Sequence, residues 1–481
     1  MLNKINLVLL SKVILYVTLV FLLLMLPSIF IKMDESTPFF IVKLTKLIFA
    51  FITLSFIFKF INLKELSSRI FLLLILTAAL SLRLWWIYKV DTEPFSDFKV
   101  MYEAAFELAN GNTEGIYNNH YFFIYADNIG FTVYQAFILL FFKSILALKI
   151  VNAITGTLIV YLIYKISQNI FSEEVARITA VIVTLYSPFI VYTSVLTNQT
   201  LSIFLILLGL LLFFKKKNLI VVGVLLGLAY LIRPTAIIYI IGVSFTIIYE
   251  ALSSHKSDIK NILHYSIIRN LKIGIPFLAI VFIASALFQT ANISKHSLFE
   301  NPIPNYKLLV GLNQESRGGY SQEDARLLGN PENFRLQVDS LISQRTADKR
   351  KMATLFIDKF NIMWGNHDSS LFWAMTKDVK KKNEFNFIKL YERYFYLAII
   401  LLAVIFVIST LRNRINIEPS KLVFICITIL GFILAYLFIE IQTRYRYEIY
   451  PLFILLAGAG VAIAYKRIFP NTEEIAQITT P

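Results

Sequence analysis

Cysteine is nearly absent from this chain of 481 residues: there is a single one, Cys426, and it lies inside an apolar segment. One cysteine excludes an intramolecular disulfide. The sequence also lacks a phosphate-binding glycine loop, a zinc-type Cys/His spacing and a serine nucleophile elbow, so an ATP-driven or hydrolytic mechanism has no support. It has no solenoid-type repeat period and no low-complexity tract.

Charged residues are scarce as well. They make up 16% of the chain, whereas 57% of the residues are hydrophobic and the mean hydropathy is +0.68. Soluble proteins average about 45–50% apolar residues, so the excess predicts an integral membrane protein. The net charge is +15, but the basic residues are spread among loops. We interpret them as orientation signals and contacts to membrane lipids, and we expect no nucleic-acid partner.

Apolar runs long enough to cross a bilayer predict the architecture. The first, 5–31, is too long for a signal-peptide core and lacks a clear cleavage site, so it reads as a membrane anchor. Segment 130–147 only just reaches the minimum length of a span. If it is re-entrant or interfacial, every later basic cluster lies in the cytoplasm. Twelve spans follow, near 5–31, 38–61, 70–89, 148–166, 176–195, 199–214, 218–232, 235–250, 272–289, 394–411, 421–440 and 448–466; counts of eleven and thirteen stay open.

The predicted fold class is therefore an all-α polytopic protein of the cell membrane, with both termini cytoplasmic and an extracytoplasmic active site. Its large polar loop is too long for a connector and has helix-like stretches, which predicts a small extracytoplasmic subdomain. The expected parts are an N-terminal transmembrane hairpin (1–69), a core (70–289) with a first outer loop (90–129), the loop subdomain (290–393), and C-terminal transmembrane helices with a short cytoplasmic tail (394–481).

The first outer loop contains a segment, 94–111, that is typical of a short amphipathic helix lying in the membrane interface. Ser96 or Asp97 can cap it and Gly111 can close it. Asp97 lies where the chain leaves the membrane, so its carboxylate can reach solvent and lipid headgroups. A carboxylate there can take a proton from an acceptor. The alternative is that Asp97 is only a helix cap.

Two further polar residues lie at predicted span ends. Asn198 follows the span 176–195 on the outer side, where it can bind an acceptor, orient Asp97, or merely cap the next helix. Arg233 lies in Leu231-Ile-Arg-Pro-Thr235 between two short spans. An arginine at a membrane surface can bind phosphate through two hydrogen bonds, although snorkelling to headgroups is an alternative.

The most unusual basic cluster is Gln442-Thr-Arg-Tyr-Arg-Tyr-Glu-Ile-Tyr-Pro451, which includes Arg444, Tyr445 and Arg446. These two arginines lie on the predicted outer side, against the positive-inside trend. A charge at a membrane boundary needs a partner, and a phosphate of a polyprenyl carrier would serve. Salt bridges to Glu440 or Glu448 are the alternative.

Two motifs in the large loop contain further candidates, Arg317 in the first and His367 and Asp368 in the second. These side chains can line a substrate site or belong to turns. Adjacent His and Asp residues are poorly spaced for binding a metal. We therefore predict no metal site and no cofactor, and a divalent metal has no support in the sequence.

Four pieces of the chain together resemble the polytopic GT-C glycosyltransferases, in the glycosyltransferase family 39-like branch of protein O-mannosyltransferases and aminoarabinose transferases. They are Ser96-Asp97-Phe98 with Glu103; Ala176 to Pro188 followed by Leu196-Thr197-Asn198; Gly223 to Thr235; and Gln442 to Pro451. The resemblance spans residues 96 to 451. Each motif is weak alone, and their order and predicted outer placement give the resemblance its specificity.

This resemblance implies a GT-C bundle and an inverting transfer of a hexosyl or pentosyl group from a polyprenyl-phosphate carrier to an envelope acceptor, which can be a protein, a wall polymer or a lipid. It makes Asp97 the general base, and Arg233, Arg444 and Arg446 contacts to the carrier phosphate. The family often has an acidic pair at the first-loop site and an acidic residue near Asn198. Neither is present here, which puts a two-carboxylate metal site in doubt.

Two other functions stay open: a flippase or transporter of lipid-linked glycans, and a polymerase or ligase of such glycans. Transporters usually place charged residues at the membrane midplane and show repeated halves. Here the spans are mostly free of charge and no two halves match. The pattern therefore favours the transferase.

Overall fold

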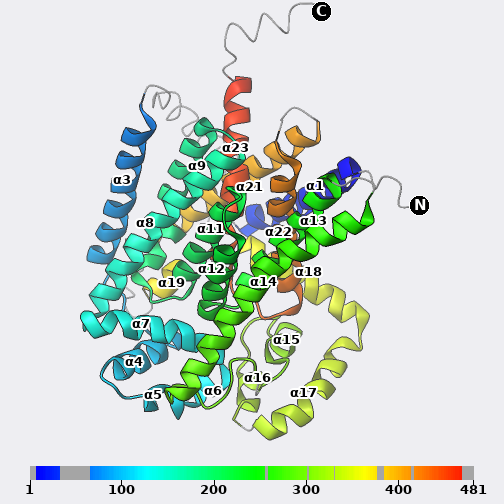
Figure 1. Ribbon diagram of the computed structural model, residues 1–481. Helices are drawn as coiled ribbons and strands as arrows, with labels where there is room; N and C mark the ends of the chain where they lie inside the picture. The colour runs from blue at the N-terminus through cyan, green and yellow to red at the C-terminus, as the bar shows by residue number, and fades with distance from the viewer. Residues whose placement is uncertain are drawn as a thin grey trace, which may run out of the picture.

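The computed structural model describes residues 7–32, 66–254, 258–300, 303–329, 331–375, 384–412 and 417–468, and these residues form helices and connections without a β-strand (Figure 1). The predicted all-α class is confirmed. The longer helices are α1 (Leu7–Lys32), α3 (Ser68–Lys89), α8 (Ile145–Ile170), α9 (Glu173–Leu185), α11 (Gln199–Phe214), α12 (Leu219–Ile232), α13 (Ala236–Ser254), α14 (Ile259–Thr290), α21 (Phe387–Leu411), α22 (Pro419–Phe438) and α23 (Tyr450–Ile468).

The remaining helices connect these, and many of them gather at the end of the bundle that is lowest in Figure 1, opposite the C terminus. They are α4 (Asp97–Ala109), α5 (Glu114–Tyr117), α6 (His120–Ile124), η1 (Ala126–Asn128), α7 (Ile129–Phe141), α10 (Pro188–Val191), η2 (Tyr192–Ser194), α15 (Tyr306–Gly311), α16 (Gln322–Leu327), α17 (Pro331–Thr346), α18 (Lys349–Gly365), α19 (Ser370–Ala374) and η3 (Thr443–Glu448).

Polar caps explain where several long helices begin. The side chains of Ser67, Ser144, Ser172, Asn218 and Asp258 accept hydrogen bonds from the first backbone N–H groups of α3, α8, α9, α12 and α14. Each such cap contributes about 1 kcal/mol. The apolar runs therefore become helices with defined starts at their polar ends.

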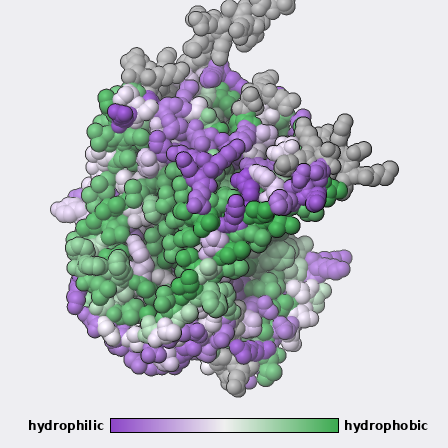
Figure 2. Space-filling view, viewed as in Figure 1, coloured by the Kyte–Doolittle hydropathy of each residue, from purple (hydrophilic) through white to green (hydrophobic). Residues whose placement is uncertain are grey.

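The surface carries a hydrophobic band between two more hydrophilic ends (Figure 2). Among the described residues, seven helices are long and apolar enough to cross a membrane, or up to eight if α9 and segment 188–194, bent by 62°, form one span. The chain is thus a multi-pass membrane protein, but the count of twelve spans is not confirmed. The predicted span 38–61 lies outside the described residues, and the predicted spans 199–214 and 218–232 correspond to the shorter helices α11 and α12.

Segment 130–147 does not form one helix. Most of it is α7, and α8 already begins at Ile145. With 13 residues, α7 is about 20 Å long, short of the roughly 30 Å hydrocarbon core of a bilayer. In Figure 1 it lies beside α4 and across the direction of the long helices.

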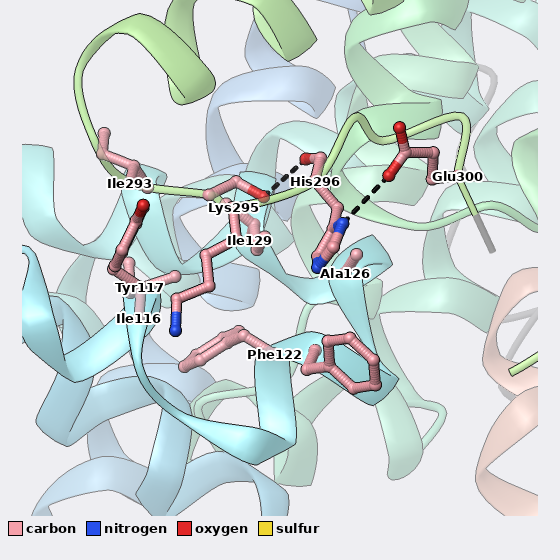
Figure 3. A pocket seen from close by; sticks show the side chains of 11 residues that line it. Ile116, Tyr117, Phe122, Ala126, Ile129, Ile293, Lys295, His296 and Glu300 are labelled. Carbon is pink, nitrogen blue, oxygen red and sulfur yellow. Dashed lines mark hydrogen bonds and ion pairs between the residues drawn. The ribbon is translucent and has the colours of Figure 1, made fainter. Parts of the chain in front are cut away.

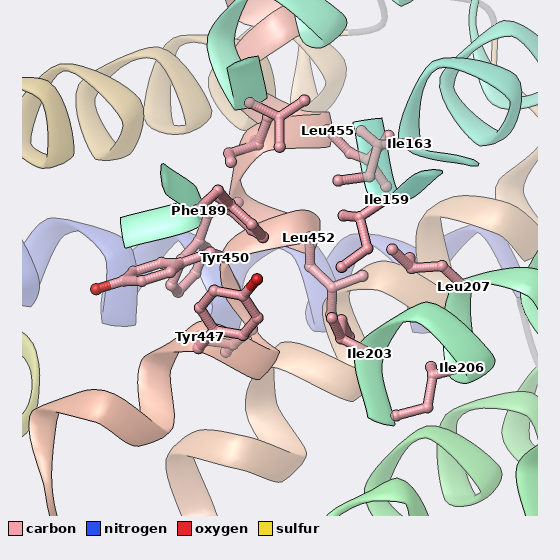
Figure 4. Packing of buried hydrophobic residues seen from close by; sticks show 14 of the residues in the cluster. Ile159, Ile163, Phe189, Ile203, Ile206, Leu207, Tyr447, Tyr450, Leu452 and Leu455 are labelled. Carbon is pink, nitrogen blue, oxygen red and sulfur yellow. The ribbon is translucent and has the colours of Figure 1, made fainter. Parts of the chain in front are cut away.

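The core is packed where η3 and the start of α23 meet α8, α10 and α11 (Figure 4). Tyr447 and Tyr450 contact the ring of Phe189 there, at centroid distances of 4.8 and 6.4 Å. Large aromatic side chains contribute most to such packing because each buries a large area. This core holds η3 in place between α22 and α23.

The helices between α14 and α21 are tied to the segment that precedes η3. The backbone N–H of Glu440 donates to the carbonyl of Lys307 at 3.0 Å, and that of Ile441 donates to the carbonyl of Gly318 at 2.9 Å. Gly311 packs so closely that an added Cβ would lie 2.1 Å from the carbonyl oxygen of Phe438. These contacts fix the backbone just before Arg444.

Candidate active site

The site begins at the first turn of α4. Ser96 occupies the N-cap position without a side-chain capping bond, and Asp97 is the first helical residue. Ser96 has a φ of +53°, which is uncommon for a residue other than glycine. Backbone strain of this kind clusters at functional sites. The helix predicted from 94–111 is present, with Phe98, Met101 and Ala105 buried on one face.

The carboxylate of Asp97 pairs with a guanidinium rather than with its own helix. Its Oδ2 lies 3.6 Å from Nη2 of Arg444, and its side chain is 41% exposed against 8% for the arginine. The Arg444 guanidinium lies over the rings of Trp373 and Phe98, 4.4 and 5.2 Å from their centroids. Its Nε is buried and has no hydrogen-bond partner among the described residues. Such a group suits an anionic ligand.

A row of charged and aromatic groups continues from Arg444. The ring of Tyr445 lies 5.5 Å from the guanidinium carbon of Arg444 and 4.9 Å from that of Arg233. Arg233 in turn pairs with the buried carboxylate of Glu448. Burial raises the pKa of the Glu448 carboxyl, and the neighbouring guanidinium opposes this rise. The row therefore runs from Asp97 through Arg444, Tyr445 and Arg233 to Glu448.

A hydrogen-bond network of amides positions Arg233. Its Nη1 donates to Oδ1 of Asn198, and Nδ2 of Asn198 donates to Oδ1 of Asn128, both at 3.1 Å. Nδ2 of Asn128 donates to the hydroxyl of Tyr121 at 2.8 Å. Asn198 precedes α11 but makes no side-chain capping bond, so the cap alternative does not describe its contacts.

Tyr121, on α6, is the last residue of this network. Burial raises the pKa of its hydroxyl, and the carboxylates of Asp97 and Asp127 raise it further. The phenol consequently stays protonated at neutral pH and keeps its O–H group as a hydrogen-bond donor.

Two further predicted residues, Arg446 of the C-terminal cluster and Asp368 of the large loop, are buried. Arg446 is fully buried, with its guanidinium over the rings of Tyr396 and Tyr450 at 4.9 and 5.9 Å. Asp368 is buried as well and accepts hydrogen bonds from the hydroxyl of Tyr450 and the N–H of Ser370. Two guanidinium nitrogens of Arg446 are buried without a hydrogen-bond partner among the described residues. The phosphate contact at Arg446 and the substrate contact at Asp368 stay predictions. The salt bridges considered for Arg444 and Arg446 do not involve Glu448, because Glu448 pairs with Arg233.

Three other candidates have exposed side chains. Glu103 pairs with Lys99 on the outer face of α4 at 3.5 Å. Arg317 has a φ of +51° and pairs with Asp358 at 3.9 Å. His367 is exposed in the connection between α18 and α19. Their predicted role in substrate binding stays a prediction.

The row does not fit a metal site built on two carboxylates. Asp97 is paired with Arg444 and Glu448 with Arg233, and nowhere in the described ranges do three His, Cys, Asp or Glu side chains converge as metal ligands. The residues around Asp97 therefore match a site that binds an anion, and we derive no step through a metal.

A small pocket lies beside this site, between α5–α7 and the connection that follows α14 (Figure 3). Its walls include Tyr117, Phe122 and Ile129, and Lys295, His296 and Glu300 lie at its edge. The His296 ring nitrogen is 3.0 Å from the Glu300 carboxylate. The pocket contains neither Asp97 nor the arginines, so it is separate from the row.

Comparison with known proteins finds one family that is similar to part of the chain. Residues 129–280, about a third of the chain, match the family described as dolichyl-phosphate-mannose-protein mannosyltransferase. The matched segment contains Asn198 and Arg233. This segment of the chain is therefore similar to that mannosyltransferase family. The resemblance inferred from the sequence is thereby confirmed for this part of the chain.

Two solved structures are distantly similar to this chain. One is the archaeal oligosaccharyltransferase AglB from Archaeoglobus fulgidus in complex with an inhibitory peptide and a dolichol-phosphate, at 12% identity and a TM-score of 0.34. The other is the oligosaccharyltransferase from the same organism in the apo form, at 12% identity and a TM-score of 0.36. Each likeness covers 87% of this chain and 60% of the other, and neither is close enough to carry an argument. No curated protein matches the chain.

Several residues at the candidate site were not predicted from the sequence. Asn128 and Tyr121 lie in a tyrosine-rich stretch that predicts no contact to Arg233. Trp373 and Lys307 lie in the large loop, outside both motifs considered there. Nothing in the local sequence indicates these positions, because their partners lie on other helices.

Proposed function

We propose that the chain transfers a sugar from a polyprenyl-phosphate carrier to a hydroxyl or amine acceptor, with inversion, and that Asp97 is the general base. The observation that carries this proposal is the contact between the partly exposed carboxylate of Asp97 and the guanidinium of Arg444 at the start of α4. A base for the acceptor and a cation for the leaving phosphate thus lie in one row. We further propose that this end of the bundle faces the outside of the cell.

The order of the residues in the row sets the orientation of the donor in this proposal. Inversion requires the acceptor and the leaving phosphate to lie on opposite faces of the anomeric carbon. Asp97 is at one end of the row and Arg233 lies further along it, beyond Tyr445. In the proposal the sugar therefore lies toward Asp97, and its phosphate lies toward Arg233 and the free Nε of Arg444.

The chemical step follows from these positions. The carboxylate of Asp97 takes the acceptor proton while the acceptor oxygen or nitrogen bonds to the anomeric carbon. The bond from that carbon to the phosphate oxygen breaks, and its electron pair stays on the phosphate. Arg233 and Arg444 stabilise the charge that develops there. The products are the glycosylated acceptor, the polyprenyl phosphate and a protonated Asp97.

The first experiment measures transfer from synthetic polyprenyl-phosphate sugars to membranes of the source cell by purified protein. We expect Asp97→Asn to lower the rate at least about a hundredfold, the smaller end of the range for loss of a general base. Asp91→Asn is the matched control, because this neighbouring carboxylate is 87% exposed and outside the row. Full activity in Asp97→Asn would remove Asp97 as the base, and no transfer from any donor would favour a flippase.

A further inference from the structure

Two cationic side chains lie against the ring of Tyr445, and the large loop supplies a third cation to the same end of the molecule. Arg444 and Arg233 lie within 6 Å of the Tyr445 ring centre, as described above. The third cation is Lys307, the second residue of α15, which pairs with Asp127 of η1. Lys307 comes from the large loop, whereas Arg233 comes from the C-terminal end of α12 and Arg444 from η3.

The contact of Lys307 with Asp127 places this lysine at the Arg233 end of the row. Its Nζ lies 3.2 Å from Oδ2 of Asp127, the neighbour of Asn128 in η1. Asn128 is hydrogen-bonded to Asn198, which accepts from Arg233. Lys307 is thus connected to the Arg233 guanidinium through Asp127, Asn128 and Asn198.

The backbone of Lys307 is fixed to the segment that carries Arg444. Its carbonyl accepts from the N–H of Glu440 at 3.0 Å, four residues before Arg444. The side chain is nevertheless 52% exposed and Asp127 is 29% exposed, so a ligand can reach the ammonium group. The Asp127 carboxylate raises the pKa of Lys307, which keeps its side chain charged at neutral pH.

A phosphate monoester that leaves as a dianion calls for more positive charge than one arginine supplies. Each of the three cations here is matched by one carboxylate: Arg444 by Asp97, Arg233 by Glu448, and Lys307 by Asp127. The Glu448 side chain is fully buried, whereas those of Asp97 and Asp127 reach solvent, so a phosphate can compete with these two for their cations. Arg446, the third cation expected from the sequence, is buried against aromatic rings.

We propose that Lys307 binds the phosphate of the lipid-linked donor, so that the loop subdomain supplies the third cation of the donor site. This assignment rests on the proposed function, because it takes a polyprenyl phosphate as the ligand. It also gives the subdomain a direct part in donor recognition.

The test measures binding of a synthetic polyprenyl phosphate, without a sugar, to the full-length protein in detergent, with the matching polyprenol as the uncharged probe. We expect Lys307→Ala to raise the Kd for the phosphate about tenfold, which corresponds to about 1.4 kcal/mol. Lys307→Arg restores most of the affinity, and polyprenol binding does not change in either variant. Lys295→Ala is the matched control, because Lys295 is an exposed lysine at the same end of the molecule, over the ring of Tyr117.

The outcomes separate this proposal from the proposed function. An unchanged phosphate Kd in Lys307→Ala, with transfer by the wild type intact, overturns the role of Lys307 alone. A loss of affinity that is equal for phosphate and polyprenol also overturns it, because the lysine would then support the fold. If the wild type binds polyprenol and polyprenyl phosphate equally, both proposals fail.

Discussion

The pair of Arg233 and Glu448 is the most buried ion pair of the site, with side chains 14% and 0% exposed. Breaking a buried pair leaves one charge without compensation and costs about 3–5 kcal/mol. We therefore expect Glu448→Gln to lower the thermal unfolding midpoint strongly in detergent. Glu448→Gln combined with Arg233→Met removes both charges, and we expect the double variant to lose less than the two single variants together.

Thermal unfolding of the two single variants and the double variant measures this coupling. Lys99→Ala with Glu103→Ala is the matched control, because that pair is 59% and 58% exposed and contributes little. Additive effects at Arg233 and Glu448 would contradict a coupled buried pair.

At the residue scale the sequence indicates which groups can carry chemistry, but not how they pair. Asp97, Asn198, Arg233 and Arg444 stand out because each is polar and lies at the end of an apolar run. Their partners could not be predicted, since Asp97 and Arg444 are far apart in the chain. The burial of Arg446 could not be predicted either, because it depends on the rings of other helices.

At the scale of elements, Lys359 ties α18 to the ends of two other helices. It is fully buried, and its Nζ donates to the carbonyls of Gly311 and Ile439 at 2.6 and 2.8 Å. Burial lowers the pKa of this ammonium from 10.5 to about 7, and Glu440 opposes the shift. The contact therefore depends on pH.

The sign follows from proton linkage. Between pH 7 and 10.5 the unfolded chain holds the Lys359 proton more firmly than the folded chain, so the free energy of unfolding rises with pH. The contribution of Lys359 to the free energy of unfolding is lost as the pH falls through the folded-state pKa of about 7. We expect Lys359→Met to flatten the rise, measured as thermal unfolding midpoints across this window. Lys351→Met, an exposed change on the same helix, leaves the rise unchanged; an unaltered slope in Lys359→Met would contradict the assignment.

The helices themselves are well predicted from the sequence, since long apolar runs and polar caps act locally. Segment 130–147 shows the limit, because a break after Phe141 divides an apolar run that has no proline or charge before Lys143. The bend of 62° between α9 and segment 188–194 is marked by Pro188, but its angle depends on packing.

At the scale of the whole molecule, the proposed function requires the end that carries α4 to face the outside of the cell. The sequence predicts this from basic clusters such as 215–217, which connect α11 and α12. Asp97 and Arg444 gather at the opposite end of the bundle, where α4 lies (Figure 1). A misplaced span would reverse the predicted side of every later loop. The side of the membrane on which α4 lies is therefore tested directly.

The single buried cysteine makes that test simple. In a Cys426→Ser background, Glu103→Cys introduces a thiol at an exposed position of α4, and Lys216→Cys introduces one at an exposed position between α11 and α12. We expect a membrane-impermeant maleimide to label the first in intact cells and the second only after permeabilisation. The reverse pattern would place Asp97 on the cytoplasmic side, where the acceptor would have to be a cytoplasmic molecule. Labelling of both thiols in intact cells would place the two ends on one side and contradict the bundle topology itself.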